Sequence, residues 1–426
     1  MQIIHGLLGL GFFCAVSWLM SSHKKRMPWR VIFGGIGLQI FLAWLFLETS
    51  AGVRVFGAAK DFVVKLVSMS EPGAKMVFGV LADPVKMGEV FGPENGFIFS
   101  FAGKGLVVII FFSALMGVLY HLGVMQLLVW LMAKVMSWAL GVSGAESMSM
   151  AANIFVGQTE APLVVKPYIS AMTRSELNAL MTGGFATIAG SVLAVYLTVI
   201  GEEYGAHLLT ASVLSAPAAF VIAKIMQPEV DAPVTSGTVE LRFDRNASNM
   251  IEAAANGTTD GLKLWMNVIA MLIAFVALVH LVNWPLGAIG EGLGMETALD
   301  LDYIFGRVFS PIAWLMGVEG WNDCQLFGSL LGTKIAVNEF VAFSQLEAYL
   351  PVEGSVTAVF QHERSAKMAA YALCGFANFA SVGIQLGGIT PLAPDRKKDI
   401  ASLALRAMLG GAFASWMTAT VAGIFL

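Results

Sequence analysis

Charged side chains are scarce in this sequence of 426 residues, and their scarcity excludes whole classes of protein. Only 13% of the residues are charged and 57% are hydrophobic, whereas a soluble domain usually carries about a quarter charged residues. The formal net charge of −4 offers no basic surface for nucleic acid. These proportions predict a polytopic membrane protein.

Cysteine and histidine are also rare. Cys14, Cys324 and Cys374 lie far apart in apolar runs, so the sequence predicts neither a disulfide framework nor a zinc-type cluster. The 6 histidines show no ligand spacing such as HExxH. We therefore expect no bound cofactor.

What the sequence does contain is a series of long hydrophobic segments. Crossing roughly 30 Å of hydrocarbon takes about 20 apolar residues in a helix. The sequence predicts spans at about Ile3–Met20, Val31–Leu47, Leu106–Leu122, Leu177–Ile200, His207–Met226, Leu262–Val282, Lys367–Ile389 and Ile400–Leu426. Residues 49–100 and Met125–Leu140 mix polar with apolar positions and are predicted as interfacial helices, with a solvated loop helix as the alternative for the former.

The basic residues orient these spans. They cluster at Lys24–Arg30, after the first span, and at Arg396–Lys398, before the last. Because cytoplasmic loops carry the excess of lysine and arginine, both clusters are predicted to be cytoplasmic and both termini periplasmic. The polar stretch Gln227–Gly261 is predicted as another cytoplasmic loop. The short loops and the absence of a recognisable signal peptide favour a multi-pass membrane protein, and with the family resemblance given below we expect it in a bacterial inner membrane.

Two segments with a central carboxylate do not fit as simple spans. Ser147–Ser170 contains Glu160 and Leu326–Leu350 contains Glu339, each between apolar arms too short to cross singly. Such segments are typical of re-entrant hairpins, which are tolerated where protein covers their tips or they line a cavity. A carboxylate at that depth indicates a functional site. The alternative is a pair of surface helices with solvated acids.

An internal repeat follows these segments. Gly184–Thr187 reads GFAT after the first and Gly375–Asn378 reads GFAN after the second, which predicts a break in each following helix. In the predicted topology the hairpins enter from opposite sides, a pattern of secondary transporters with a site at the repeat interface. The predicted fold class is an all-α polytopic membrane protein. It has eight transmembrane helices plus two re-entrant helical hairpins in inverted repeats, with interfacial helices.

Neutral and acidic hydrogen-bonding groups dominate the polar centres, namely Gln158, Thr159, Glu160, Asn338, Glu339, Asn378 and Ser381. The nearest cation is Lys334, so an anionic substrate is disfavoured. Carboxylates accept and amides both donate and accept, which suits a neutral ligand with hydroxyls and a planar amide edge. Phe376 either stacks on a ring of that ligand or packs within its helix.

Asn153 and Thr187 bring further neutral oxygens to one helix break. Together with unwound backbone carbonyls they would suit a hard cation such as Na⁺. Either residue alone is more often a helix–helix hydrogen-bonding group. Only the pair makes Na⁺ a worthwhile hypothesis.

Four motifs together resemble the concentrative nucleoside transporter family: GQTEAPLVVKPYI, GGFATIAGSVLAVY, NEFVAF and ALCGFANFASVGI. The resemblance runs from about residue 100 to the end. It implies a homotrimer in the lipid bilayer, with a scaffold domain and a mobile transport domain in each protomer. We accordingly expect scaffold and interfacial helices in 1–145, a first hairpin repeat in 146–227, a cytoplasmic loop and scaffold helix in 228–310, and a second hairpin repeat in 311–426.

The resemblance also implies roles for individual residues. Those expected at the nucleobase are Gln158, Thr159, Glu160, Val192 and Phe376. Those expected at the ribose hydroxyls are Glu339, Asn378 and Ser381. The expected sodium site comprises the side chains of Asn153 and Thr187 and the backbone carbonyls of Val156 and Ile188.

The function so implied is a sodium-coupled symporter that takes up nucleosides by alternating access. Uridine-like pyrimidine nucleosides are expected, and the preference between pyrimidine and purine stays open, as does the Na⁺ stoichiometry. Proton coupling is the alternative, because some bacterial members use protons, although those tend to lose the polar sodium set. An enzyme and a channel are the rival classes of protein. Paired acids could perform acid–base chemistry, but the sequence shows no nucleophile constellation.

Overall fold

The structure, a computed structural model, describes residues 2–83, 86, 89, 106–237, 247–295, 297–350 and 360–426. Within these residues the chain forms helices and no β-strand. The predicted interfacial segment 49–100 therefore lies only partly inside the described residues. The all-helical fold class is confirmed.

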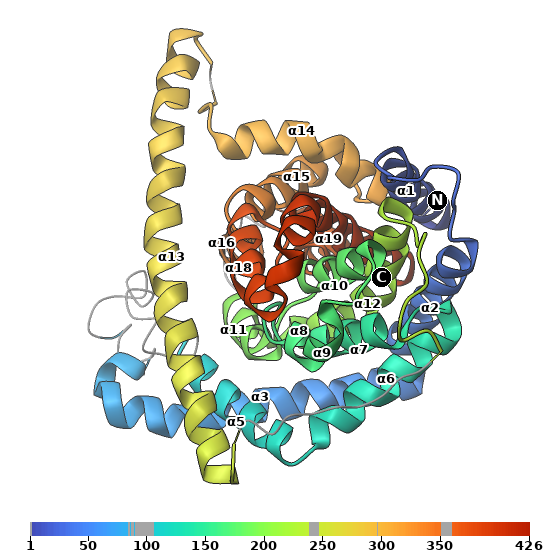
Figure 1. Ribbon diagram of the computed structural model, residues 1–426. Helices are drawn as coiled ribbons and strands as arrows, with labels where there is room; N and C mark the ends of the chain where they lie inside the picture. Colours follow the sequence, from blue (N-terminus) through green and yellow to red (C-terminus); the bar gives the residue numbers. More distant parts are fainter. Residues whose placement is uncertain are drawn as a thin grey trace.

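An outer frame of helices surrounds a central group (Figure 1). The frame consists of α1 (Gln2–Leu19), α2 (Trp29–Leu47), α3 (Ser50–Phe78) with the short η1 (Gly79–Ala82), α5 (Val108–His121), α6 (Val124–Leu140), α13 (Met250–Gly292) and α14 (Leu301–Met316).

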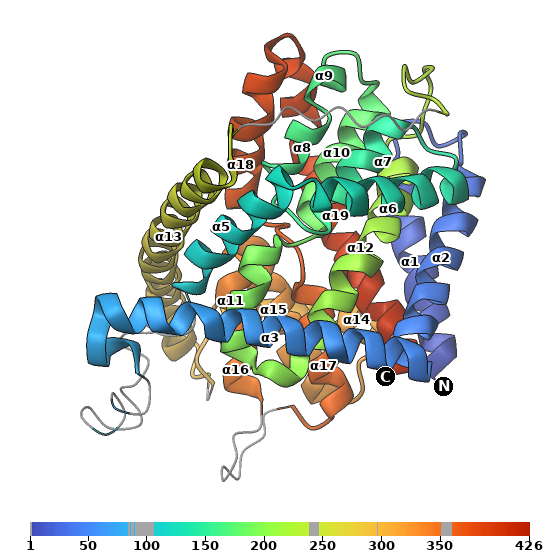
Figure 2. The same cartoon turned by 90° about the horizontal axis from the view of Figure 1, so that it is seen from below.

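Two parts of the frame follow directions that differ from those of simple spans. Helix α3 begins at Thr49, whose hydroxyl accepts from the Gly52 amide at 3.0 Å, and it runs crosswise to α1, α2 and α12 (Figure 2). Helices α5 and α6 meet at a bend of 77°. The bend lies at Gly123, whose φ of 82° falls in the left-handed region that glycine tolerates. The crosswise course of α3 agrees with an interfacial helix.

Helix α13 corrects the predicted loop Gln227–Gly261. The helix begins at Met250, where the Asn249 side chain accepts from the Glu252 amide at 2.9 Å. Its first turns pack closely on α5, since a Cβ at Gly257 would lie 2.4 Å from the carbonyl oxygen of Ser113. The exposed side of these turns carries polar residues such as Asp260, which make the segment look like a loop in a hydropathy count, while small residues on the other side allow the close approach to α5.

The central group carries most of the buried residues. It consists of α7 (Gly144–Asn153), α8 (Ala161–Val164), α9 (Lys166–Ile169), α10 (Arg174–Ala186), α11 (Gly190–Ile200), η3 (Glu202–Tyr204), α12 (Gly205–Met226), α15 (Trp321–Ala336), α16 (Glu339–Tyr349), α17 (Glu363–Leu373), α18 (Phe379–Ile389), η4 (Thr390–Leu392), η5 (Pro394–Arg396) and α19 (Lys397–Phe425). Helices α10 and α12 pack along α19, whose Trp416 is fully buried.

Both predicted helix breaks are present. The segment predicted as Leu177–Ile200 is divided at Thr187–Ala189 into α10 and α11. The segment predicted as Lys367–Ile389 is divided at Cys374–Asn378 into α17 and α18. Each break follows the repeated Gly-Phe-Ala motif or contains it, so the repeat marks real interruptions of the helical backbone.

Five stretches of the described chain are long and apolar enough to cross a membrane: Trp29–Leu47, Arg174–Ile200, Glu202–Met226, Met250–Gly292 and Pro394–Phe425. The bent pair α5–α6 passes the same test when taken as one, and α1 is a shorter apolar helix. These helices agree with a membrane protein. The count of eight spans and the re-entrant course of the hairpins stay predictions.

Candidate substrate and sodium site

The first carboxylate segment forms a helical unit with an irregular tip. Helix α7 ends at Asn153, residues 154–160 leave the helical path, and the short α8 and α9 complete the unit. At its start, the hydroxyl of Ser143 accepts from the Glu146 amide, and the Glu146 carboxylate accepts from the Ser143 amide at 2.7 Å. This reciprocal cap defines where α7 begins.

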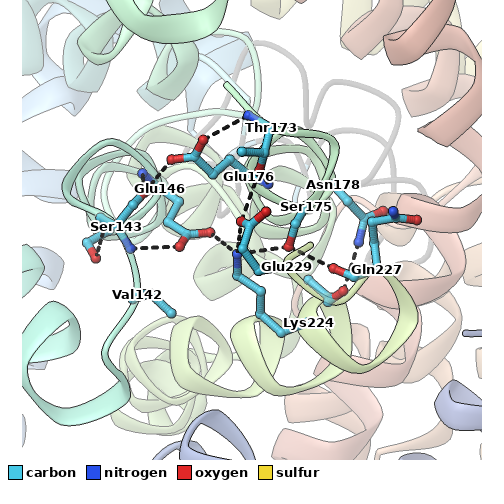
Figure 3. A network of polar contacts seen from close by, with 12 residues as sticks. Val142, Ser143, Glu146, Thr173, Ser175, Glu176, Asn178, Lys224, Gln227 and Glu229 are labelled. Atoms are coloured by element: carbon cyan, nitrogen blue, oxygen red, sulfur yellow. Dashed lines mark hydrogen bonds and ion pairs between the residues drawn. The ribbon is translucent and has the colours of Figure 1, made fainter. Parts of the chain in front are cut away.

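A buried ion-pair network holds the base of this unit (Figure 3). The ammonium of Lys224, on α12, lies 2.7 Å from the Glu146 carboxylate and 3.3 Å from the Glu229 carboxylate. It also donates to the Ser175 hydroxyl at 2.9 Å. The network thereby joins α7, α10 and α12, and it fixes the end of α7 that lies opposite Asn153.

The second carboxylate segment is a helix–turn–helix. Helix α15 ends at Ala336, and α16 begins at Glu339 after a turn of two residues. The Asn338 side chain accepts from the Val341 amide at 2.8 Å and so caps α16. Asn338 therefore has a local structural role. The sequence predicts this residue only as one of the polar groups at the centre of the segment.

The two Gly-Phe-Ala motifs meet in space. Gly375 has a φ of 146°, and a Cβ there would lie 2.8 Å from the carbonyl oxygen of Phe185. Gly375 belongs to the second motif and Phe185 to the first. Since the breaks of the two repeats lie against each other, polar groups on either side can contribute to one site.

The Glu339 carboxylate is the best-defined polar centre of this region. It is 8% exposed. The Tyr196 hydroxyl donates to one of its oxygens and the Asn378 amide to the other, each at 2.9 Å. The Asn378 side-chain oxygen in turn accepts from the Ser381 amide at 2.8 Å and caps α18. The structure thus brings together Glu339, Asn378 and the backbone of Ser381, and their role at a ribose stays a prediction.

The predicted base-side residues lie at the tip of the first unit. The Gln158 side chain is buried, and its amide oxygen has no hydrogen-bond partner within the described chain. A Cβ at Gly388, on α18, would lie 2.8 Å from Thr159. The Gly157 amide donates to the Glu160 carboxylate at 3.0 Å. Gln158 and Thr159 therefore lie against helices of both repeats.

Glu160 differs from the prediction of a second buried carboxylate, because its side chain is exposed. It is the residue directly before α8, and its carboxylate accepts from the backbone of the tip. The predicted pocket residues Val192 and Phe376 are buried and partly buried, respectively, in the same core cluster. The lining role of these two residues is consistent with those positions and stays a prediction.

The predicted sodium residues also converge. The Thr187 hydroxyl donates to the Gly183 carbonyl at 2.9 Å, and a Cβ on Gly183 would lie 3.2 Å from the Asn153 amide nitrogen. The Asn153 side-chain oxygen is buried and has no hydrogen-bond partner in the described chain. The Gly190 amide donates to the Phe155 carbonyl at 3.0 Å and joins the tip to the break.

Two backbone carbonyls complete that set. Val156 is in the irregular tip and Ile188 in the break, and both are buried. Within the described residues neither carbonyl accepts a backbone hydrogen bond outside the helices. Together with the free Asn153 oxygen, this donor set consists of neutral oxygens, which hard cations prefer.

Sequence reasoning missed Tyr196 and Gln385. Tyr196 bonds Glu339 and stacks on Phe343 with ring centroids 4.3 Å apart. Its position four residues after Val192, on the same helix face, was a usable signal. Gln385 is fully buried, donates to the Met181 carbonyl at 3.0 Å and adjoins Gly184. A lone glutamine in an apolar run gave no comparable signal.

Three family models match this chain. The model for the Na⁺ dependent nucleoside transporter N-terminus matches residues 8–81. The model for nucleoside recognition, called Gate, matches residues 104–203. The model for the Na⁺ dependent nucleoside transporter C-terminus matches residues 207–423. The last two include every residue predicted here for the site.

Relatives resemble the chain along its length. An uncharacterized transporter of Haemophilus influenzae is 42% identical over 100% of this chain and 98% of that protein. Sodium/nucleoside cotransporter 1 of Rattus norvegicus is 38% identical, and the match covers 98% of this chain and 63% of the rat protein. Solute carrier family 28 member 3 of Mus musculus is 41% identical, over 98% of this chain and 58% of the mouse protein.

The chain also resembles a solved structure along its whole length. CNTnw in an inward-facing substrate-bound state matches with a TM-score of 0.91 and 40% identity, over 100% of this chain and 98% of that one. These matches place the molecule in the class of Na⁺-dependent nucleoside transporters. More particularly, the chain belongs to the concentrative nucleoside transporter family, which confirms the resemblance seen in its motifs.

Proposed function

We propose that this protein is a sodium-coupled symporter that takes up nucleosides by alternating access. The expected substrates are uridine-like pyrimidine nucleosides, and uptake of purine nucleosides beside them is an open question for the same assay. The observation that carries the proposal is the buried Glu339 carboxylate, held by Tyr196 and Asn378 where the two helix breaks meet. Family membership supports the same substrate class.

The ribose is assigned to Glu339, Asn378 and Ser381. A carboxylate has about four lone-pair positions, and Tyr196 and Asn378 occupy one on each oxygen. Glu339 can therefore accept from ribose hydroxyls while its two protein donors hold it in place. A neutral sugar hydroxyl donates to such a carboxylate, whereas a phosphate would be repelled by it.

The nucleobase is assigned to Gln158, Thr159, Glu160, Val192 and Phe376. The unpaired Gln158 oxygen supports this assignment, because a buried acceptor without a donor is costly and a base N–H would satisfy it. Val192 and Phe376 supply apolar surface against the ring.

Sodium is assigned to Asn153, Thr187 and the carbonyls of Val156 and Ile188. These groups lie on the tip of the first unit and on the α10–α11 break, so a cation held by all of them fastens one to the other. The same tip carries Gln158 and Thr159. Sodium thereby raises the affinity for nucleoside, and nucleoside raises the affinity for sodium by the same factor.

The whole molecule is proposed as a homotrimer of the bacterial inner membrane with both termini periplasmic. Residues 1–145 and 228–310 contribute mainly scaffold, and residues 146–227 and 311–426 form the mobile transport domain with its two re-entrant hairpins. The outer frame and central group of the fold correspond broadly to this division (Figure 1).

The test is uridine uptake into proteoliposomes that contain the purified protein. We expect accumulation above equilibrium with an inward Na⁺ gradient and none when choline replaces Na⁺. Accumulation driven by an inward proton gradient and indifferent to Na⁺ would replace sodium with proton coupling. Steady flux without any gradient would indicate a channel, and breakdown of the nucleoside by pure protein would indicate an enzyme.

A matched pair of variants tests the ion site. Thr187→Val removes the ligand oxygen while it keeps the shape of the side chain, and Thr187→Ser keeps the oxygen. We expect Thr187→Val to need at least about tenfold more Na⁺ for half-maximal uptake, and Thr187→Ser to stay close to the parent. Equal Na⁺ dependence of the two variants would remove Thr187 from the site.

A further inference from the structure

Lys334 is a fully buried lysine that neither the proposed nucleoside site nor the proposed sodium site uses. It lies in the last turn of α15 and is 0% exposed. Its ammonium donates to the Ala372 carbonyl and to the Ser415 hydroxyl, each at 2.8 Å. These contacts join α15 to α17 and α19. Among the described residues no carboxylate lies within ion-pair distance of Lys334.

This environment differs from that of the other buried lysine in the central group. Lys224 contacts the carboxylates of Glu146 and Glu229, as a buried cation ordinarily requires (Figure 3). Lys334 instead contacts a carbonyl in the last turn of α17. The last carbonyls of a helix have no intrahelical partner and form the negative end of its dipole. The chain therefore keeps a buried lysine at a helix end.

The position of that helix end relates Lys334 to the site. Helix α17 ends at Leu373, directly before the break that carries Phe376 and Asn378. Lys334 itself lies five residues before Glu339 along the chain, in the last turn of the helix that leads to it. The lysine thus connects α15, which leads to Glu339, with α17, which leads to Asn378, and these two residues meet at the proposed ribose site.

The first repeat has a comparable arrangement, if the proposed sodium site is accepted. There a cation would lie between the end of the first arm, at Asn153, and the break after α10, at Thr187. In the second repeat the ammonium of Lys334 lies between the first arm, α15, and the end of α17. A cation at the join between hairpin and broken helix is common to both.

We propose that Lys334 is a tethered cation that fastens the second hairpin to its broken helix, as Na⁺ fastens the first. In this role it is a positioning residue for Glu339 and Asn378. The first repeat then exchanges its cation with solution, whereas the second retains its cation covalently. The inference rests on the proposed function, because the comparison needs sodium in the first repeat.

The test compares Lys334→Met with the parent protein in detergent. We expect the dissociation constant for uridine at saturating Na⁺ to rise at least about tenfold, since the polar join behind the ribose residues is lost. In the absence of uridine, Na⁺ should stabilise the variant and the parent protein against unfolding with the same half-maximal concentration. The replacement leaves the Ala372 carbonyl without the donor it has in the parent protein, so we expect the unfolding temperature to fall only by the small amount that one unpaired acceptor costs.

Unchanged uridine affinity would overturn the proposal, and so would a parallel loss of uridine affinity, Na⁺ affinity and thermal stability, which indicates general damage. If Lys334→Met does not yield folded protein, Lys334→Gln, which keeps a donor without the charge, is judged by the same criteria. Ser415→Ala is the control, because Lys334 keeps Ala372. If the parent protein shows no Na⁺-dependent uridine binding, the proposed function fails first.

Discussion

At the scale of single residues, Glu339 connects helices of both repeats. It begins α16, accepts from Tyr196 on α11, and accepts from Asn378 at the start of α18. Three helices from both repeats therefore depend on one carboxylate. A group so placed serves the structure and the substrate at once, and two substitutions can separate these roles.

Replacing Glu339 by glutamine should abolish uptake. Glutamine keeps the length of the side chain but loses the charge, and each hydrogen bond to a charged group contributes about 1.5–3 kcal/mol. Two ribose hydroxyls would then bind at least about 100-fold more weakly. Uridine uptake in proteoliposomes gives the result, with size-exclusion chromatography to check assembly. Near-normal uptake would remove Glu339 from the ribose site.

Replacing Tyr196 by phenylalanine should have a smaller effect. The change removes the hydroxyl that donates to Glu339 but keeps the ring that stacks on Phe343. Because the carboxylate loses only a protein donor, we expect uridine affinity to fall about tenfold. Calorimetric titration with uridine measures the change. An unchanged affinity would mean that Asn378 alone suffices to orient the carboxylate.

At the scale of elements, the helix breaks are the feature on which the site depends. Each break turns one apolar segment into two short helices whose ends lie within the protein, and helix ends present unpaired backbone groups and capping side chains. Here those ends carry Thr187 and Asn378. The breaks also touch, through Gly375 and Phe185, so the geometry of one repeat constrains the other.

Gly375→Ala tests that contact between the breaks. The alanine Cβ would meet the Phe185 carbonyl at 2.8 Å, and the φ of 146° disfavours any side chain. We expect a loss of about 1–3 kcal/mol in stability, seen as a lower unfolding temperature, together with weaker uridine binding. Gly383→Ala on α18 is the matched control, because a Cβ there meets nothing within 4 Å.

An effect of Gly383→Ala as large as that of Gly375→Ala would show that the loss of stability does not come from the contact between the breaks. The contact between the breaks would then explain nothing. A loss of stability and uridine affinity in Gly375→Ala alone would support a structural role for the contact between the two Gly-Phe-Ala motifs.

At the scale of the whole molecule, the frame leaves apolar surface outside the protomer. The most apolar part of α13 has none of its residues buried within the protein, and Ile273, Leu281 and Trp284 are exposed. Lipid or another protomer can cover such a surface. The proposed homotrimer predicts that part of it is a protein interface.

The expected mass of the assembled protein is three times the protomer mass of 45.4 kDa. Native mass spectrometry of the protein released from detergent measures it directly, free of bound detergent. A monomer under conditions that preserve Na⁺-dependent uridine binding would show that the trimer is not needed for binding. The apolar face of α13 would then be a lipid-facing surface.

The sequence by itself determined that the chain is an all-helical membrane protein, where its helices break, and which polar residues lie next to the breaks along the chain. These features depend on local composition: apolar length, Gly-Phe-Ala interruptions, and carboxylates in apolar surroundings. It also carried the family motifs. It did not reveal the early start of α13, because the exposed polar residues of the first turns look like a loop in a single chain.

Only the tertiary structure decided which polar groups meet. It joined Tyr196 to Glu339 across 143 positions of the chain, left Glu160 exposed, and placed Lys334 behind the end of α17 rather than beside a carboxylate. Hydrogen-bond partners far apart in sequence depend on how helices pack, and that packing is set by side-chain shape in three dimensions. Composition and spacing along one chain contain no direct record of it.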